Sequence, residues 1–323
     1  ETIKKFQLGY SPDEWTALTD AAIEKGYQLD FLEKTGLTIV KEEKKFDRFK
    51  GRVMFPIQNI SGRVLGFGGR ILTSDKKAAK YLNSPESDIY HKSKVLYGIF
   101  HAKKSIVAKD TCYLVEGYTD VISLHQSGVE NVVASSGTSL TIEQIRLIKR
   151  YTPNITILFD GDAAGLKASF RGIDMILEAG LNVKVVLFPD GEDPDSYARS
   201  HTQAEILSFL DSESKDFIKF KTDVLLKEAG KDPIKKAGLI KDIVESIALI
   251  PDPIIRSVYI QECSSMMGME EEMLLTELNK SRKQKISKKL AAPNESNPSI
   301  NVPEYLPKES SKSTARKVNY QEQ

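Results

Sequence analysis

The stretch ITILFDGDAAGLKAS, residues 155–169, carries the most information about the fold. It begins with an apolar run that ends at Phe159, and Asp160 and Asp162 follow on either side of Gly161. A short apolar run bounded by a turn is typical of a buried strand, and the small residues after Asp162 are typical of a helix start. The stretch therefore predicts a strand, a tight turn and a helix, with two like charges placed where the strand ends.

The same order of elements recurs on both sides of this stretch. Strands are predicted at 112–115, 131–134, 155–159 and 183–187, and helices near 118–126, 141–150 and 163–179. Strands that alternate with helices form a mainly parallel, twisted sheet that the helices cover. The sequence from residue 111 onward therefore predicts an α/β fold.

Acidic residues follow three of the predicted strands at the point where each strand ends. They are Glu116, Asp120, Asp160, Asp162, Asp193 and Asp195. In a parallel sheet the carboxyl ends of the strands share one edge, so we expect these side chains to gather there. Carboxylates at close range repel one another, and a divalent cation relieves that repulsion. Oxygen ligands suit Mg²⁺ or Mn²⁺, which makes this edge a candidate metal site.

A structural interpretation of the same residues stays open. Asp-Gly-Asp is a common turn, and acidic residues cap helix N-termini well. An EF-hand calcium site is excluded, because its fifth and twelfth positions, counted from Asp160, are Ala164 and Arg171. Three acidic clusters at three strand ends favour a multi-part site over turns alone.

The charges are distributed unevenly along the chain. The 323 residues are 40% hydrophobic and 28% charged, with a formal net charge of +1. Residues 41–109 nonetheless hold 16 Lys or Arg against 6 Asp or Glu, whereas residues 111–205 hold 7 against 13. A basic block beside an acidic block suggests a polyanionic partner next to a metal site, although ordinary solvated surfaces would give the same charge counts.

Composition excludes several classes of protein. No apolar run approaches the ~20 residues of a membrane helix, and no signal segment begins the sequence. Cys112 and Cys263 match no zinc spacing, so we expect them to be buried thiols of a protein in a reducing cytoplasm. No G-x-x-x-x-G-K-[ST] motif is present, so no P-loop motor is predicted here. Because residue 1 is Glu, we expect a fragment or a processed chain.

Four segments are predicted along the chain. Residues 1–110 mix helical patterns with two strands, 52–57 and 63–67, joined by a turn. Residues 111–205 form the α/β domain. Residues 206–285 are helical by periodicity, with breaks at Pro233, Pro251 and Pro253, and residues 286–323 are rich in Ser, Asn, Pro and Lys, as in a flexible linker or tail.

The acidic clusters carry a family resemblance. The sequences EGYTD at 116–120, DGDAAG at 160–165 and DPD at 193–195 resemble the three motifs of the Toprim domain, which topoisomerases, bacterial primases, some nucleases and a recombination mediator share. Within the basic block, GFGGR at 66–70 and KYLNSPE at 80–86 resemble the N-terminal part of the polymerase core of bacterial DnaG-type primases. The resemblance implies a mixed α/β basic N-terminal subdomain, a Toprim-type parallel sheet flanked by helices, and a C-terminal helical subdomain.

The resemblance also implies a function and a site. It indicates a DNA-dependent RNA polymerase that makes short RNA primers on single-stranded DNA by metal-dependent nucleotidyl transfer. Glu116, Asp160 and Asp162 would be catalytic and would hold Mg²⁺ or Mn²⁺, with Asp120, Asp193 and Asp195 as further metal residues. The residues expected to bind nucleotide or DNA are Arg52, Arg70, Lys80, Tyr81, Asn83 and Lys92. Tyr81 and Asn83 could instead simply pack against the fold, and packing is favoured over stacking for Tyr81.

Partners and neighbouring domains follow from the same resemblance. Whole primases begin with a zinc-binding domain and end with a helicase-binding domain, and we expect both to be absent here, so no zinc is expected. The expected partners are single-stranded DNA and ribonucleoside triphosphates, with the replicative helicase reached through the missing domain. We expect a monomer in the bacterial cytoplasm, at replication forks on the nucleoid, with no contact to membranes.

Two other functions remain as alternatives. A non-catalytic DNA-binding Toprim module would tolerate loss of a carboxylate, yet every acidic motif is filled here. A Toprim nuclease could use the same metal site. A topoisomerase needs a tyrosine nucleophile, and Tyr259, in an apolar helical stretch, is expected to pack in a core.

Overall fold

The computed structural model describes residues 1–73, 79–137, 139–161, 166–229 and 232–291. Residues 1–282 form one compact unit, and the chain beyond them forms a second. The boundaries predicted after residues 110 and 205 stay predictions. Within the described residues, no helix combines the length and the apolar composition needed to cross a membrane.

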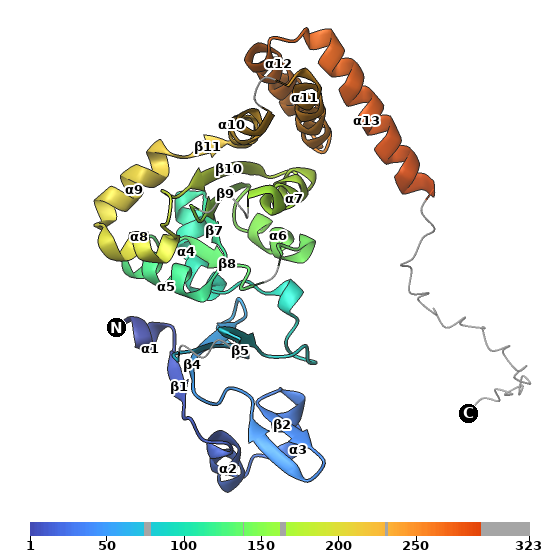
Figure 1. Ribbon diagram of the computed structural model, residues 1–323. Coiled ribbons are helices and arrows are strands. Elements are labelled where there is room, and N and C mark those ends of the chain that lie inside the picture. Colours follow the sequence, from blue (N-terminus) through green and yellow to red (C-terminus); the bar gives the residue numbers. More distant parts are fainter. Residues whose placement is uncertain (74–78, 138, 162–165, 230–231, 292–323) are drawn as a thin grey trace, which may run out of the picture. The chain divides into compact units, whose positions relative to one another are not determined.

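A parallel sheet lies at the centre of the first unit (Figure 1). Its strand order is β11-β10-β9-β7-β8, and only β11 pairs antiparallel. The strands are β7 Cys112–Val115, β8 Val132–Ala134, β9 Asn154–Phe159, β10 Asn182–Leu187 and β11 Lys215–Asp216. The predicted α/β class and its four strands are confirmed, whereas β11 was not predicted.

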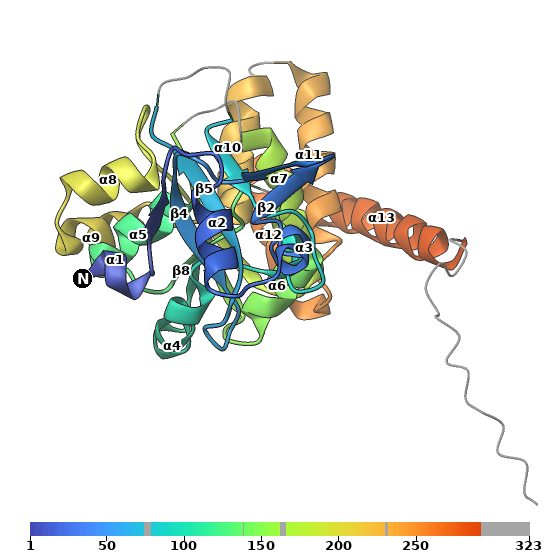
Figure 2. The same ribbon diagram turned by 90° about the horizontal axis from the view of Figure 1, so that it is seen from below.

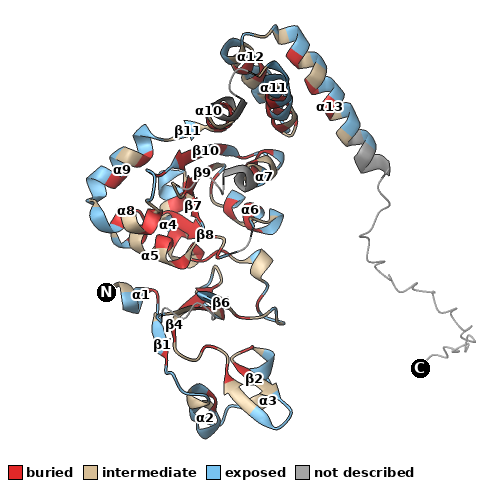
Figure 3. Cartoon of the chain, viewed as in Figure 1, coloured by how far each residue is buried: buried red, intermediate tan, exposed pale blue. Residues whose placement is uncertain are grey.

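Helices cover both faces of this sheet. They are α4 Ile99–Lys109, α5 Tyr118–Gln126, α6 Ile142–Lys149, α7 Leu166–Glu178, α8 Pro194–Ser200 and α9 Gln203–Ser212. Figures 1 and 2 show α5, α8 and α9 on one side and α6 and α7 on the other. Alternate strand residues point to two separate cores: Ile157 packs with α7, and Leu158 packs with α5. The sheet is therefore buried on both faces, as Figure 3 shows.

An antiparallel sheet precedes the parallel one. Its order is β1-β4-β5-β6, with strands β1 Gly9–Ser11, β4 Arg52–Gln58, β5 Val64–Ile71 and β6 Tyr81–Asn83. The predicted hairpin is confirmed, with Gln58 opposite Val64 at its closed end. The other N-terminal elements are α1 Thr2–Lys5, α2 Ala17–Glu24, α3 Leu29–Lys34, β2 Thr38–Lys41, β3 Lys44–Asp47 and the short 3₁₀ helix η1 Lys92–Lys94.

The C-terminal segment is helical, as predicted. Its helices are α10 Phe217–Ala229, α11 Pro233–Ile247, α12 Pro253–Met267 and α13 Glu271–Ala291. Pro233 and Pro253 open helices, and the Asp232 and Asp252 carboxylates cap them by accepting bonds from backbone N–H groups at 2.9 and 2.7 Å. Helix α13 continues to Ala291, past the predicted start of the tail at residue 286, and that boundary stays a prediction like the other two. Residues 292–323 lie outside the described residues.

Gly68 provides a test of how the two sheets meet. A Cβ at Gly68 of β5 would lie 2.5 Å from Cζ of Tyr118, whose buried hydroxyl is bonded to Asn83. We expect Gly68→Ala to lower the free energy of unfolding by about 1–3 kcal/mol, because the ring has no room to move away. Urea denaturation measures this.

Gly9→Ala is the matched control for Gly68→Ala. Gly9 lies in β1 of the same sheet, and nothing stands within 4 Å of its added Cβ. Equal losses of stability in the two variants would contradict the close packing of Gly68 on Tyr118.

Candidate functional site

The carboxyl ends of the parallel strands meet at one edge of the sheet. Leu114 pairs with Ile157, and Phe159 pairs with Leu187, so β7, β9 and β10 end at the same level. Glu116 and Asp160 therefore leave the sheet side by side with the loop that follows β10. The register places the ends of the three strands that precede the acidic motifs at one edge of the sheet, and the predicted site there stays a prediction.

Gly161 fixes the turn that follows β9. Its N–H donates to the carbonyl of Glu192 at 3.0 Å, and an added Cβ would lie only 2.1 Å from the Pro189 carbonyl oxygen. Only glycine fits where two backbones approach this closely. The turn thereby brings Asp160 against the loop that carries Asp193.

Asp120, like Asp195, is a buried carboxylate of this edge. Its Oδ2 accepts the Gly117 N–H at 2.8 Å and so caps the start of α5. Burial raises the Asp120 pKa to about 7, the Gly117 bond opposes the rise, and the charges of Asp160, Asp193 and Asp195 add to it. Three neighbouring carboxylates are thus close enough to act on Asp120 electrostatically.

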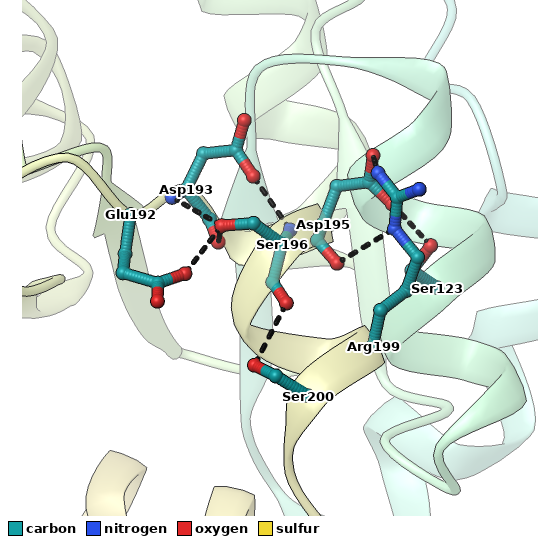
Figure 4. A network of polar contacts seen from close by, with 7 residues as sticks. All are labelled: Ser123, Glu192, Asp193, Asp195, Ser196, Arg199 and Ser200. Atoms are coloured by element: carbon teal, nitrogen blue, oxygen red, sulfur yellow. Dashed lines mark hydrogen bonds and ion pairs between the residues drawn. The ribbon is translucent and has the colours of Figure 1, made fainter.

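Asp193 and Asp195 hold the start of α8 in place (Figure 4). The Asp193 Oδ1 accepts the Ser196 N–H at 2.6 Å, which caps the helix. The Asp195 Oδ1 accepts the Ser123 hydroxyl of α5 at 2.5 Å, and its Oδ2 pairs with Arg199. Both carboxylates therefore have structural roles, and their predicted metal roles stay predictions.

Glu116 is the acidic residue of this edge that lines a cavity. Glu116 is exposed and lines a cavity of about 700 Å³, together with Ser135, Gly137 and Arg171. In the described part of the chain, no side chain bonds to its carboxylate. Asp160 is half-buried, and Asp162 lies outside the described residues. Among the residues that the structure does describe, no three His, Cys, Asp or Glu side chains are arranged to hold a metal ion.

Asn83 joins the basic block to the acidic edge. Its Oδ1 accepts the Tyr118 hydroxyl at 2.6 Å, and its Nδ2 donates to the Ser136 carbonyl at 3.2 Å. The Lys92 ammonium donates to the next carbonyl, Gly137, at 3.1 Å. The ends of β7 and β8 are therefore bordered directly by residues of the N-terminal sheet and of η1.

Tyr118 and Ser136 were not among the predicted site residues. Tyr118 belongs to the EGYTD motif, so the motif was a signal for it. Ser136 has φ of +59°, a left-handed conformation that is uncommon outside glycine and that often marks functional sites. Its sequence context, Ser-Ser-Gly, gave no such signal.

Arg70, Lys80 and Tyr81 form a small cluster on the adjacent strands. The Arg70 guanidinium carbon lies 5.7 Å from the centre of the Tyr81 ring, and the Lys80 ammonium lies 5.9 Å from it. Tyr81 is 36% exposed, and its ring centre is 6.2 Å from that of Tyr118. The structure thus brings these predicted residues together beside Asn83, with part of the tyrosine open to a ligand.

Arg52 is buried beside this cluster instead of being exposed on it. Its side chain is buried, and Nη1 donates to the carbonyls of Ala79 at 3.0 Å and Gly69 at 3.3 Å. Burial lowers the pKa of the guanidinium. Arg52 therefore ties β4 to β5 and to the chain before β6, and its predicted role in DNA binding stays untested.

Comparisons with known proteins give three family matches in chain order. Residues 1–103 match the DNA primase catalytic core, N-terminal domain; residues 113–198 match a Toprim-like family; and residues 218–272 match the DnaB-helicase binding domain of primase. The third match shows that the expected absence of a helicase-binding domain was wrong. Helical periodicity at 206–285 does not distinguish a bundle that only packs from one that binds a partner.

Individual relatives agree with these matches. A DNA primase of Clostridium acetobutylicum is 39% identical over 287 residues, covering 87% of this chain and 47% of that protein, and one of Halalkalibacterium halodurans is 38% identical over 284 residues, covering 86% and 46%. The chain thus spans about half the length of these curated relatives.

Solved structures are similar over most of the chain. A DNA primase domain from Pseudomonas aeruginosa has a TM-score of 0.76 and 33% identity, covering 86% of this chain and 88% of that one. The Escherichia coli primase catalytic core has a TM-score of 0.73 and 32% identity, covering 83% and 87%.

The raised pKa of Asp120 predicts a pH dependence of stability. The carboxyl has a pKa near 3.8 when unfolded and about 7 when folded, so the folded state holds its proton more tightly. This contribution is present below pH 4 and is lost as the pH rises through 7, at a total of about 4 kcal/mol. In chelator, wild-type stability should therefore fall over this range more steeply than that of Asp120→Asn, as thermal unfolding can measure.

Asp88→Asn, on the surface, is the control for Asp120→Asn. It should follow the wild-type pH curve. Identical curves for the wild type and Asp120→Asn would show that Asp120 is already ionised in the folded protein.

Proposed function

The chain belongs to the DnaG-type family of DNA primases, and from this premise we propose that it is the RNA polymerase core that makes short RNA primers on single-stranded DNA. The observation that carries the proposal is the contact through Asn83, which joins a basic, partly aromatic surface to the acidic sheet edge. A polymerase needs both surfaces side by side, because one binds the polyanion and the other acts on its reacting phosphate. A solved relative described as a DnaG primase catalytic domain bound to single-stranded DNA, 32% identical with a TM-score of 0.72, supports the same assignment.

The reaction joins the 3′-hydroxyl oxygen of one nucleotide to the α-phosphorus of the next. That oxygen–phosphorus bond forms, the bond to pyrophosphate breaks, and the hydroxyl proton is lost. Bound Mg²⁺ or Mn²⁺ acidifies the hydroxyl and stabilises the negative charge on the departing pyrophosphate. Glu116, Asp160 and Asp162 would hold the metal, with Asp193 and Asp195 as further metal residues.

The donor set fits such a cation. Every candidate ligand is a carboxylate, as Mg²⁺ and Mn²⁺ prefer. The charges of Asp160, Asp193 and Asp195 help raise the pKa of Asp120, which indicates a strongly negative field at this edge. Glu116 is exposed on the cavity, where it is also available to accept the hydroxyl proton.

The basic surface would bind the template and the incoming nucleotide. Arg70 and Lys80 flank the half-exposed Tyr81, so phosphate pairing and base stacking are available at one place. Lys92 adds a further cation beside the Gly137 carbonyl. Asn83, which Tyr118 and Ser136 hold in place, would then help to orient the template.

The other functions find less support. The relatives are primases, and Tyr259 is poorly suited as a cleavage nucleophile. Its hydroxyl donates to Asp216 at 2.8 Å, its ring packs on Phe217, and burial raises its pKa. A monomeric state and association with the nucleoid stay predictions.

We propose the replicative helicase as a partner of residues 218–272. Within this segment, Ile254 and Val258 lie one turn apart on α12 and are 74% and 57% exposed. Large apolar side chains exposed together on one helix face are typical of protein-binding surfaces.

Primer synthesis is the direct test of the enzyme. With single-stranded DNA, ribonucleoside triphosphates and Mg²⁺ or Mn²⁺, the wild type should produce short RNA. Glu116→Gln and Asp160→Asn should each lower the rate by about two orders of magnitude, because each removes a metal-holding carboxylate. Gel analysis of labelled products measures this.

Two outcomes would contradict the primase assignment. Absence of RNA with unchanged DNA binding would favour the binding module, and degradation of the template would favour a nuclease. Asp88→Asn, a surface change, should keep wild-type activity and serves as the control.

Helicase binding has its own test. Ile254→Asp combined with Val258→Asp should weaken binding to the helicase by about tenfold or more, because two charges would replace apolar side chains that the bound helicase would bury. Val107→Asp on α4, 59% exposed and outside the matched segment, is the control. Equal helicase affinities of the wild type and the Ile254→Asp, Val258→Asp double variant in a titration would place the helicase contact elsewhere.

A further inference from the structure

One residue of α10 packs against the chain on both sides of the acidic turn. Phe159, which directly precedes Asp160, stacks on Phe220 with ring centres 6.0 Å apart and planes at 18°. Phe170 of α7, the helix after the turn, meets the same ring edge-on at 6.3 Å and 78°. Phe220 is 4% exposed, so its ring is fixed between strand end and helix.

A chain of buried polar contacts joins the same elements. The Lys221 ammonium of α10 donates to the Ser246 hydroxyl of α11 at 2.8 Å and to the Asp242 carbonyl at 3.0 Å. The Ser246 hydroxyl in turn donates to Asp174 Oδ1 of α7 at 2.6 Å. Lys221 also lies 5.3 Å from the centre of the Phe170 ring.

The burial of these groups makes the arrangement specific. Lys221 is 6% exposed and Ser246 is 1% exposed. A buried ammonium and a buried hydroxyl lose water, so each tolerates only positions in which its hydrogen bonds are made. A slip of α7 along α10 or α11 would break the Ser246–Asp174 bond. Apolar packing alone would resist such a slip less strongly.

We infer that Phe220, Lys221 and Ser246 are positioning residues for Asp160, which directly follows β9. They act through Phe159, Phe170 and Asp174, and they touch no reacting atom. Residues 218–272, which match a helicase-binding family, therefore help to hold the metal site in place. This inference rests on the proposed function, because it assumes that Asp160 holds a cation.

The consequence is measurable because metal ligands tolerate little displacement. Groups that orient metal ligands typically change metal affinity or activity by about 10–100-fold when they are removed. A residue that serves stability alone would lower the melting temperature and leave the metal affinity of the folded protein unchanged. Mn²⁺ binding therefore separates the two roles, independently of activity.

The experiment compares two variants with two matched controls in the same helical bundle. Phe220→Leu and Ser246→Ala remove the contacts to β9 and α7. Phe217→Leu alters another buried phenylalanine of α10, whose ring contacts Tyr259, and Tyr259→Phe removes the buried hydroxyl bond to Asp216. Mn²⁺ affinity is measured by titration, beside melting temperature and the rate of primer synthesis.

We expect Phe220→Leu and Ser246→Ala to weaken Mn²⁺ binding and slow primer synthesis by about tenfold, and both controls to stay within about twofold of the wild type. Equal Mn²⁺ affinities in all four variants, at comparable losses of melting temperature, would overturn the inference.

The outcome for the wild type distinguishes this inference from the proposed function. If the wild type makes primers and Ser246→Ala binds Mn²⁺ like the controls, the inference fails and the function stands. If the wild type binds Mn²⁺ without making primers and Ser246→Ala still weakens binding, the function fails and the inference stands.

Discussion

The charges of Asp160, Asp193 and Asp195 all act on the buried Asp120 at the end of the parallel sheet, and the surrounding structure holds these residues there against that repulsion. The strands beneath them are buried on both faces, so their carboxyl ends cannot separate without opening two cores. The Gly161 backbone lies so close to the Pro189 carbonyl that a side chain would not fit between them, and this contact fixes the turn after β9. The fold therefore arranges negative charge before any cation is bound, so little reorganisation is needed when one arrives.

The carboxylates at this edge have different roles. Asp120 and Asp193 cap α5 and α8, and Asp195 joins those two helices through Ser123. Glu116 instead faces the cavity. The sequence presents a capping turn and a metal site as alternatives for these acidic residues, but the two are compatible. The capping residues hold the helix starts in place, and Glu116 beside them stays available to a ligand. The N-terminal positive ends of α5 and α8 also moderate the repulsion.

Local patterns made much of this predictable from sequence. The strands of the parallel sheet and the turn at Gly161 depend on residues adjacent in the chain, so the pattern suffices. Arg52 was harder, because its carbonyl partners lie 17 and 27 positions further along the chain and its residue type alone suggests phosphate binding. The strained Ser136 and the short β11 are set by tertiary contacts, and residues 218–272 carry an ordinary helical pattern. Asp162 lies outside the described residues, so its role stays a prediction.

The buried Lys221 shows what polar contacts add to an apolar core. Removing an ammonium from water costs free energy, and apolar side chains of similar volume often stabilise a core equally well. Stability alone therefore gives little reason for a lysine between α10 and α11. Apolar surfaces can slide over one another with little loss, whereas the bonds from Lys221 through Ser246 to Asp174 are satisfied in only one register of α7. A helix that must hold the acidic turn in one place needs that register more than it needs the additional stability.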